Sequence, residues 1–439
     1  MSDELKREVG VFDVVINVLN LSVASGIFLF PAILAGILGS AGILAYILCG
    51  FLFLLVVLCY AEISSRITAT GGTYVYIEKA FGPFAGFIAN TLFWFGTGVF
   101  VTAALVNGLT DMLSVPFPIF NNIFYRAIFF IVIISFCATV NIVGIKQGMR
   151  TVKILTVLKL LPLILLVIAG LYNLKISNLQ WTGFPGIQKL GAASLILFFA
   201  FAGGETVLNI SGEMKNPKRT GPLGLLIGTI LIILFFCLIQ LTAQGVMGDA
   251  LVNHKEAPLA AMAESLFGKP GFTILIIAAM VSIFGTLNSI ILLFPRILYA
   301  GAENKLLPAY LAKVHPKYST PHRAIIIFSM IAFVIAISGG FRQLAVLVTA
   351  SILLLYIGVV LAVIKTRLQK KEDNPASFNL PGGLSIPVAA LITLCWFLWQ
   401  LKRNELIGIG IFIGIISAIY FLRKLIKKKI NGSTCTHSY

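Results

Sequence analysis

Charged residues are scarce in this chain of 439 residues: they make up 11% of it, while 59% of the residues are hydrophobic. Soluble globular domains carry a charge at roughly a quarter of their positions. The mean hydropathy of the chain is +1.00. This composition excludes an ordinary soluble protein, and we expect most of the chain to lie in a lipid bilayer.

Patterns typical of metal centres, disulfide frameworks and nucleotide hydrolysis are also missing. The four histidines form no HExxH motif and the six cysteines form no CxxC motif, so neither a metal site nor a disulfide framework is expected. No GxxxxGKS or GxxxxGKT loop occurs, which argues against an ATP-driven motor. No apolar segment combines a nucleophile with a base. We therefore expect no cofactor and no enzymatic activity.

Long apolar segments dominate the chain instead. Their lengths are close to the ~20 residues that a helix needs to cross an ~30 Å hydrocarbon core. The segments are continuous, whereas the strands of a membrane barrel alternate over ~10 residues. The sequence therefore predicts an all-α integral membrane protein of about twelve transmembrane helices. The predicted spans are 11–38, 41–65, 83–110, 124–144, 152–174, 190–213, 222–246, 271–300, 323–338, 342–366, 384–401 and 405–425.

The net charge of +17 is concentrated on one side of these spans. Most of the 33 lysine and arginine residues fall in alternate connections that share a side with both termini. By the positive-inside rule this side is the cytoplasm. The sequence thus predicts a multi-pass protein of the cell (plasma or inner) membrane with both termini in the cytoplasm. The basic residues then face anionic lipid, and no nucleic acid partner is expected.

Two predicted spans are interrupted by small, polar or acidic residues. The first contains Ala24, Ser25 and Gly26, and the sixth contains Gly203 and Glu205. Each opens a group of five spans, which indicates an inverted repeat with two broken helices. The break frees backbone groups at the bilayer centre, and half-helix N-termini attract an anion such as a substrate carboxylate. The alternatives are a helix-packing contact at Ser25-Gly26 and a structural hydrogen bond that Glu205 accepts from a freed backbone amide nearby.

These observations predict a domain organisation. It comprises 1–10 as a cytoplasmic N-terminus, 11–174 as the first five-helix repeat, 190–366 as the second, 384–425 as peripheral helices 11 and 12, and 426–439 as a basic cytoplasmic tail. Hydropathy sets the bounds of the spans, and the two breaks group the spans into repeats. That helices 11 and 12 are peripheral is implied by the resemblance described next.

Four motifs, in order along the chain, resemble those of the amino acid-polyamine-organocation permeases. They are Ala24-Ser25-Gly26-Ile27-Phe28, Gly71-Gly72-Thr73-Tyr74 with Phe81-Gly82-Pro83-Phe84, Phe201-Ala202-Gly203-Gly204-Glu205 with Asn216-Pro217-Lys218-Arg219, and Arg296-Ile297-Leu298-Tyr299-Ala300 with Leu307-Pro308. The resemblance runs from about Gly10 to Leu401. It implies a five-plus-five inverted repeat, alternating access to a site between helices 1, 3, 6, 8 and 10, and amino acid or amine substrates. Helices 1 to 3 are most similar to bacterial arginine/agmatine-type exchangers, and helix 8 to neutral amino acid exchangers.

The resemblance also implies a division of labour between the two breaks. Backbone amides around Ser25, Gly26 and Ile27 would bind the substrate carboxylate. Carbonyl groups near Ala202 and Gly203 would bind its ammonium group. These groups together would hold the part of the substrate that all α-amino acids share.

Further residues near the breaks take roles from the same resemblance. Phe199 falls where the family places an aromatic gate over the substrate, although packing is the ordinary role of a phenylalanine. Gly204 occupies a position that is bulky in some relatives, which would leave room for a larger substrate side chain. Ala24 stands where the family usually has glycine, so the backbone freedom of that position is in question. Glu205 is expected in substrate binding or in coupling.

Lys159 is the one basic residue that the sequence places well inside a span, the fifth. A lysine at this depth can extend its side chain back to the headgroups. The resemblance implies another role, because several proton-coupled or exchanging relatives carry a lysine where sodium-coupled members bind an ion. We therefore hypothesise that Lys159 replaces sodium, steadies the broken first helix and couples to the transport cycle through its protonation.

The sequence thus predicts a secondary active transporter, either a proton-coupled symporter or an exchanger, that moves amino acids by alternating access. A polyamine or organic amine carrier on the same fold is one alternative, and a sodium-coupled symporter is another. A channel or receptor would need a ring of pore-lining charges or a ligand-binding domain outside the membrane, and neither is visible. The expected partners are an amino acid, the lipid bilayer and protons, with the oligomeric state left open.

Overall fold

The computed structural model describes residues 9–68, 72–143, 149–181, 183–303, 307–318, 320–369, 378 and 382–434, and the side chains in these ranges except those of 149–153, 155, 210, 212, 213 and 423–434. Within these residues the chain is nearly all helical, and one isolated bridge joins Val9 to Met214. Only Val9 and Gly10 of the predicted N-terminal segment are described. The side chains of the predicted basic tail, 426–439, lie outside the described residues.

Fifteen α-helices are found in the described part of the chain. The first eight are α1 (Val11–Ser22), α2 (Ser25–Leu38), α3 (Gly42–Arg66), α4 (Thr73–Phe81), α5 (Pro83–Thr91), α6 (Phe100–Leu113), α7 (Ile123–Val143) and α8 (Met149–Tyr172). The other seven are α9 (Ile187–Phe201), α10 (Pro217–Met247), α11 (Pro258–Glu303), α12 (His322–Ser338), α13 (Phe341–Leu368), α14 (Ser385–Trp399) and α15 (Arg403–Thr434). The connections include the π-helical η2 (Leu92–Val99) and the 3₁₀ segments η1 (Gly39–Ala41), η3 (Pro118–Asn121), η4 (Ile176–Leu179), η5 (Gly204–Glu213), η6 (Gly248–Asn253) and η7 (Ala309–Ala312).

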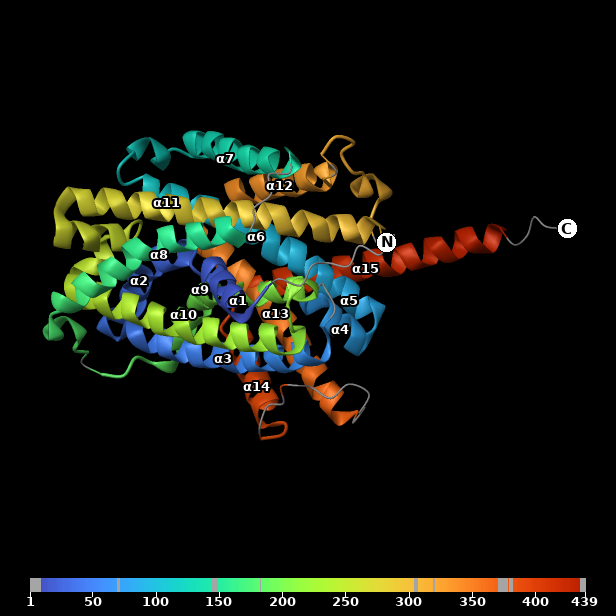
Figure 1. Ribbon diagram of the computed structural model, residues 1–439, viewed down its shortest axis with the longest axis horizontal. Helices are drawn as coiled ribbons and strands as arrows, with labels where there is room; N and C mark the ends of the chain where they lie inside the picture. Colours follow the sequence, from blue (N-terminus) through green and yellow to red (C-terminus); the bar gives the residue numbers. More distant parts are fainter. Residues whose placement is uncertain are drawn as a thin grey trace.

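Most helices lie side by side along the long axis of the molecule (Figure 1). The helices α7 and α12 pack together at one edge, α14 leans out at the opposite edge, and α15 projects beyond the bundle. Eight helical segments of the described chain are long and apolar enough to cross a membrane, and four shorter helices are also apolar. The predicted all-helical membrane architecture is confirmed, whereas the count of twelve spans stays a prediction.

The outward faces of the bundle are apolar. On α7, the exposed side chains include Ile131, Val132 and Phe136. On α8, they include Leu165 and Ile168. In water such faces would be costly, but lipid tails are as apolar as leucine, so these side chains are suited to a bilayer.

Small residues bring the helices together inside the bundle. Gly224 and Gly228 of α10 lie so close to Val14 and Val18 of α1 that a Cβ atom at either glycine would meet a valine side chain at 2.5–2.8 Å. Close approach through small residues is how membrane helices gain packing energy without a hydrophobic driving force. It holds α1, which carries the first break, firmly against α10.

One long helical segment is in fact two helices joined at a kink. Within α11, Gly268 has φ 69° and ψ −165°, a backbone conformation that favours glycine. Pro270 follows, and its fixed φ suits the first turn of a new helix. The second part of α11 is the stretch that lines the site described next.

Candidate functional site

The first break separates α1 from α2. The helix α1 ends at Ser22, α2 begins at Ser25, and the two residues between them are not helical. Ala24 has φ −122° and ψ −148°. Because this φ is negative, alanine introduces no left-handed strain at a position where the resemblance led us to expect glycine. The last carbonyl groups of α1 and the first N–H groups of α2 have no partners within their own helices.

The second break separates α9 from η5. Ala202 follows α9 in an extended conformation, and Gly203 has φ 114°, which an L side chain rarely adopts. The Gly203 N–H donates to Oε2 of Glu205 at 2.9 Å, and the Thr206 hydroxyl donates to the Gly203 carbonyl at 2.5 Å. The Glu205 side chain is only 4% exposed. The segment therefore satisfies both backbone groups of Gly203 by itself.

Lys159 of α8 lies against the first break. Its Nζ atom donates hydrogen bonds to the carbonyl oxygens of Asn20 at 2.5 Å and Val23 at 2.9 Å. The Ser282 hydroxyl of α11 donates to the same Val23 oxygen at 2.9 Å. Lys159 is 2% exposed. An ammonium group thus joins α8 to the C-terminal end of α1, where the helix dipole favours a positive charge.

A central cavity of about 70 Å³ lies between the two breaks. It is lined by Leu21, Ser22, Ala24, Gly26, Thr97, Val101, Leu105, Phe199, Ala200, Ala202, Gly203, Thr206, Thr286, Ile290, Leu293, Phe294, Val348 and Ile352. These residues come from α1, α2, η2, α6, α9, η5, α11 and α13, together with the two breaks. The cavity is therefore built by segments far apart in the sequence.

Five of the predicted site residues line this central cavity: Ala24, Gly26, Phe199, Ala202 and Gly203. The other predicted substrate-binding residues are buried beside it. They are Ser25, Ile27, Gly204 and Glu205.

Gly204 faces a neighbouring helix. A Cβ atom placed on it would meet Cγ1 of Val18 at 2.9 Å and Oγ of Ser22 at 3.4 Å. The absence of a side chain at this position therefore allows η5 to pack closely against α1.

Sequence reasoning missed the wall of the cavity opposite the breaks. Thr97 and Thr286 contribute hydroxyl groups there, and Ile290, Val348 and Ile352 contribute apolar surface. A hydroxyl between two glycines, as in Gly96-Thr97-Gly98, was the available signal in an apolar segment. The apolar residues gave no signal, because membrane helices are full of them.

The two ends of the broken helices give the central cavity opposite poles. The N-terminus of α2 presents free N–H groups and a partial positive charge at Ser25, Gly26 and Ile27. The C-terminus of α9 presents free carbonyl groups and a partial negative charge near Ala202. A molecule with a carboxylate and an ammonium group on neighbouring atoms is complementary to this arrangement.

Three phenylalanine rings form a cluster that begins at the central cavity. The ring centroids of Phe30 and Phe199 are 6.1 Å apart, and both lie 5.8 Å from the ring of Phe341. Phe199 lines the central cavity, whereas Phe341 lines a second one. The ring cluster, from α2, α9 and α13, therefore reaches from the central cavity at Phe199 to the second cavity at Phe341.

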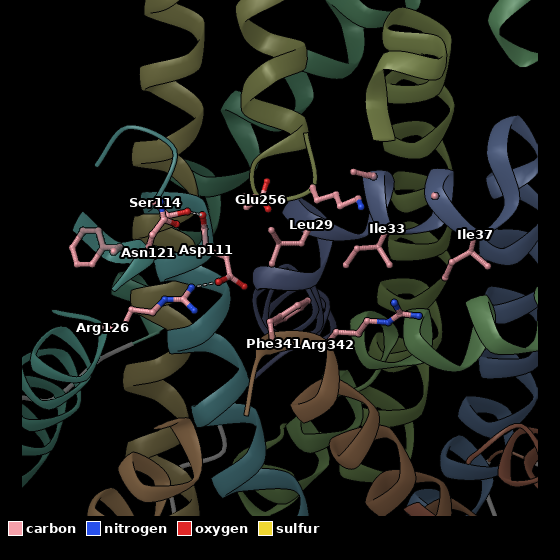
Figure 2. A pocket seen from close by; sticks show the side chains of 14 residues that line it. Leu29, Ile33, Ile37, Asp111, Ser114, Asn121, Arg126, Glu256, Phe341 and Arg342 are labelled. Atoms are coloured by element: carbon pink, nitrogen blue, oxygen red, sulfur yellow. Dashed lines mark hydrogen bonds and ion pairs between the residues drawn. The ribbon is translucent and has the colours of Figure 1, made fainter. Parts of the chain in front are cut away.

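The second cavity, which we call the charged cavity, measures about 440 Å³ (Figure 2). Asp111, Arg126, Lys255, Glu256 and Arg342 line it together with apolar side chains of α2. Figure 2 shows Arg126 and Asp111 pointing toward one another, and they form an ion pair. The charged cavity therefore carries charges of both signs, whereas none of the residues that line the central cavity is charged.

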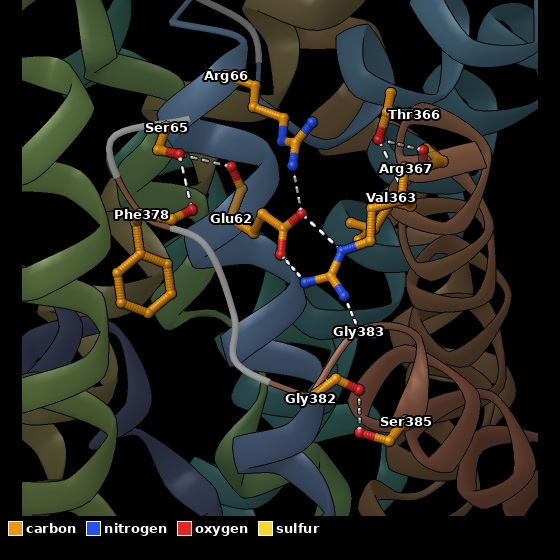
Figure 3. Close-up of polar contacts among 11 residues, drawn as sticks. Glu62, Ser65, Arg66, Val363, Thr366, Arg367, Phe378, Gly382, Gly383 and Ser385 are labelled. Atoms are coloured by element: carbon orange, nitrogen blue, oxygen red, sulfur yellow. Dashed lines mark hydrogen bonds and ion pairs between the residues drawn. The ribbon is translucent and has the colours of Figure 1, made fainter. Parts of the chain in front are cut away.

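An ion-pair cluster lies at the C-terminal end of α3 (Figure 3). Glu62, whose side chain is 1% exposed, accepts hydrogen bonds from Arg66 at 2.9 Å and from Nε of Arg367 at 2.8 Å. Arg367 also donates to the Gly383 carbonyl ahead of α14. At 1.5 Å per residue, Glu62 is about 30 Å along α3 from Gly42. This cluster therefore ties α3, α13 and the chain before α14 at the end remote from the charged cavity.

Comparison with known proteins decides the family. The amino acid permease family matches residues 9–421. The chain belongs to this family. The resemblance drawn from its motifs to amino acid-polyamine-organocation permeases is thereby confirmed.

Individual relatives match the chain over nearly its whole length. The serine/threonine exchanger SteT of Bacillus subtilis (strain 168) is 27% identical, with 94% of this chain and 95% of the relative aligned. The methylthioribose transporter of the same organism is 26% identical over 96% and 94% of the two chains. The branched-chain amino acid permease BcaP of Bacillus subtilis (strain 168) is 24% identical, with 97% of this chain and 95% of the relative aligned. By name all three relatives are transporters. The family match and the apolar helices make the present chain a multi-pass membrane protein.

Proposed function

We propose that this permease is a secondary active transporter that moves α-amino acids by alternating access and without sodium. The observation that carries the proposal is the central cavity, where the N-terminus of α2 and the C-terminus of α9 meet. A free carboxylate next to a free ammonium group is common to all α-amino acids. Methylthioribose lacks both groups, so the poles of this cavity favour an amino acid.

Sodium independence rests on the position of Lys159. Its ammonium group donates to the Asn20 and Val23 carbonyl oxygens, which are the kind of ligands that a sodium ion would need. A fixed cation at this place removes the need for a dissolved one. The cycle then runs as amino acid exchange or as symport with a proton. In symport, Lys159 and Glu205, two buried ionisable groups at the breaks, would take up and release that proton.

Alternating access follows from the domain organisation proposed for the chain. The repeats 11–174 and 190–366 each open with one broken helix, and 384–425 adds peripheral helices. Rocking of one repeat against the other would expose the central cavity first to one side and then to the cytoplasm, where both termini lie. Phe199, with Phe30 and Phe341, would close the path from the charged cavity.

Purified protein in proteoliposomes tests the proposal. Uptake of a radiolabelled amino acid is challenged with the common amino acids, their decarboxylated amines, polyamines and methylthioribose, in sodium and in choline buffers. We expect α-amino acids to compete, decarboxylated amines to compete far less, and sodium to make no difference. Equal competition by amines would favour a polyamine carrier. Sodium-stimulated uptake would overturn the proposal that Lys159 replaces a sodium ion.

Uptake into the same vesicles also distinguishes exchange from symport. Vesicles preloaded with unlabelled amino acid should accelerate uptake strongly if exchange is obligatory. A proton gradient should drive uptake into empty vesicles if the cycle is proton-coupled symport.

A further inference from the structure

The wall of the central cavity away from the two breaks has no charged side chain among the residues that line it. Its apolar part consists of Val101, Leu105, Ile290, Leu293, Phe294, Val348 and Ile352. A cationic or anionic substrate side chain would be buried there without a partner, which is strongly unfavourable. The volume of about 70 Å³ holds only a few water molecules. The cavity therefore suits a small, neutral side chain.

Four hydroxyl groups line the central cavity, and two of them already donate their proton to a backbone carbonyl. Thr206 donates to the Gly203 carbonyl, and Thr286 donates to the Ser282 carbonyl at 3.0 Å. The hydroxyls of Ser22 and Thr97 are buried without a hydrogen-bond partner among the described residues. Ser22 belongs to the first break, where the backbone poles lie. Thr97 belongs to the wall of the cavity that receives the substrate side chain.

Thr97 lies in an unusual part of the helix, and its hydroxyl is left to bind a substrate. It lies in the π-helical segment η2, and such segments are frequent at functional sites. Its neighbours Gly96 and Gly98 pack so closely on Ser351 and Phe294 that a Cβ atom at either glycine would clash. Thr102, further along, donates to the Gly98 carbonyl at 2.8 Å, as threonines in membrane helices commonly do. Thr97, only 7% exposed, makes no such bond.

We propose that Thr97 determines substrate specificity by forming a hydrogen bond with a hydroxyl group on the substrate side chain. The inference rests on the proposed amino acid transport and narrows it to small, neutral, hydroxyl-bearing amino acids such as serine and threonine. A buried hydroxyl left unpaired is costly, so a site that offers one rejects an isostere lacking its partner. Valine has the shape of threonine without the hydroxyl, so the site should reject valine and accept threonine.

The test measures the ratio of threonine to valine uptake in proteoliposomes for the wild type and for Thr97→Val. We expect the wild type to prefer threonine and Thr97→Val to reduce that preference by about tenfold. Thr97→Ser, which keeps the hydroxyl, should retain the preference. Thr102→Val is the matched control, because its hydroxyl is bonded to the Gly98 carbonyl and the residue does not line the cavity; its ratio should equal that of the wild type.

The outcomes separate this inference from the proposed function. Transport of α-amino acids with the same threonine-to-valine ratio in wild type and Thr97→Val would overturn the role of Thr97 and leave the transporter intact. Transport of lysine or arginine as readily as threonine would overturn the neutral substrate class. Failure of every α-amino acid to be transported would overturn the proposed function itself. If Thr97→Val does not fold, the threonine-to-valine uptake ratio is compared between Thr97→Ala and Thr97→Ser. Only Thr97→Ser, which keeps a hydroxyl, should retain the preference for threonine.

Discussion

The two broken helices occupy corresponding places in the chain but are stabilised in different ways. At the first break, the free carbonyl groups of α1 are bonded by side chains from other helices, Lys159 of α8 and Ser282 of α11. At the second, Gly203 is bonded by Glu205 and Thr206 of its own segment. The backbone of the first break is therefore bonded from other helices, whereas the Gly203 backbone at the second is bonded from its own segment. Each break also holds one buried ionisable side chain, Lys159 or Glu205.

This difference has a mechanical consequence for the proposed cycle. If α8 or α11 moves relative to α1, the hydrogen bonds at the first break must change length or partner. The two Gly203 hydrogen bonds at the second break can move together with their segment, because their partners lie within three residues of Gly203 in the sequence. We therefore expect substitutions of the partners to have unequal effects at the two breaks, in the order given below.

The largest effect is expected for Lys159→Ala. The change removes two hydrogen bonds from a charged group and leaves the buried Asn20 and Val23 oxygens with fewer partners. Each such bond is worth about 1.5–3 kcal/mol, so uptake should fall by about 100-fold or more. Lys175→Ala, at an exposed lysine, is the control and should retain full uptake. A folded Lys159→Ala protein with normal uptake would contradict the contrast between the breaks.

A smaller loss is expected for Glu205→Gln at the second break. The amide keeps the shape and an oxygen that accepts from the Gly203 N–H, but it loses the charge. Charge-assisted hydrogen bonds are roughly twice as strong as neutral ones, so uptake should fall by about tenfold while the protein stays folded. Glu264→Gln, at an exposed position, serves as the control. Normal uptake by Glu205→Gln across the pH range would exclude Glu205 from the mechanism.

Phe199→Ala probes the segment just before the second break. It removes two ring contacts, to Phe30 and Phe341, within the cluster that reaches from the central cavity to the charged cavity. Ring pairs contribute about 0.5–1.5 kcal/mol each, so turnover should fall by about fivefold with little loss of folded protein. Phe136→Ala, on an outward face, should leave turnover unchanged. If folded protein falls in proportion to uptake, Phe199 is a packing residue only.

The smallest effect is expected for Ser282→Ala at the first break. It removes one neutral hydrogen bond to the Val23 carbonyl, which still accepts from Lys159. A neutral hydrogen bond contributes about 0.5–1.5 kcal/mol, so uptake should fall by about threefold. Ser289→Ala is the control on the same helix, because that hydroxyl bonds to Gly285 of α11 itself. A loss as large as that of Lys159→Ala would mean that the charge of Lys159 is not what matters.

Much of the helical architecture could be predicted because it depends on local composition. A bilayer demands apolar segments with internally satisfied backbones, so hydropathy alone placed the helices close to their observed bounds. The two breaks were visible because small and acidic residues interrupt apolar runs, as at Gly203 and Glu205. Lys159 was noticed for the same reason, since a charge inside an apolar segment needs a partner.

The sequence by itself thus determined the membrane class, the approximate helix positions, the permease family and the residues at the breaks. Only the tertiary structure decided which oxygens Lys159 contacts, that Ser282 joins it and that Phe341 completes the ring cluster. It also decided that the Thr97 hydroxyl in the cavity wall has no hydrogen-bond partner among the described residues. The physical reason is that hydropathy and breaks are recorded along the chain. The partners of a buried group are instead chosen by how distant helices pack.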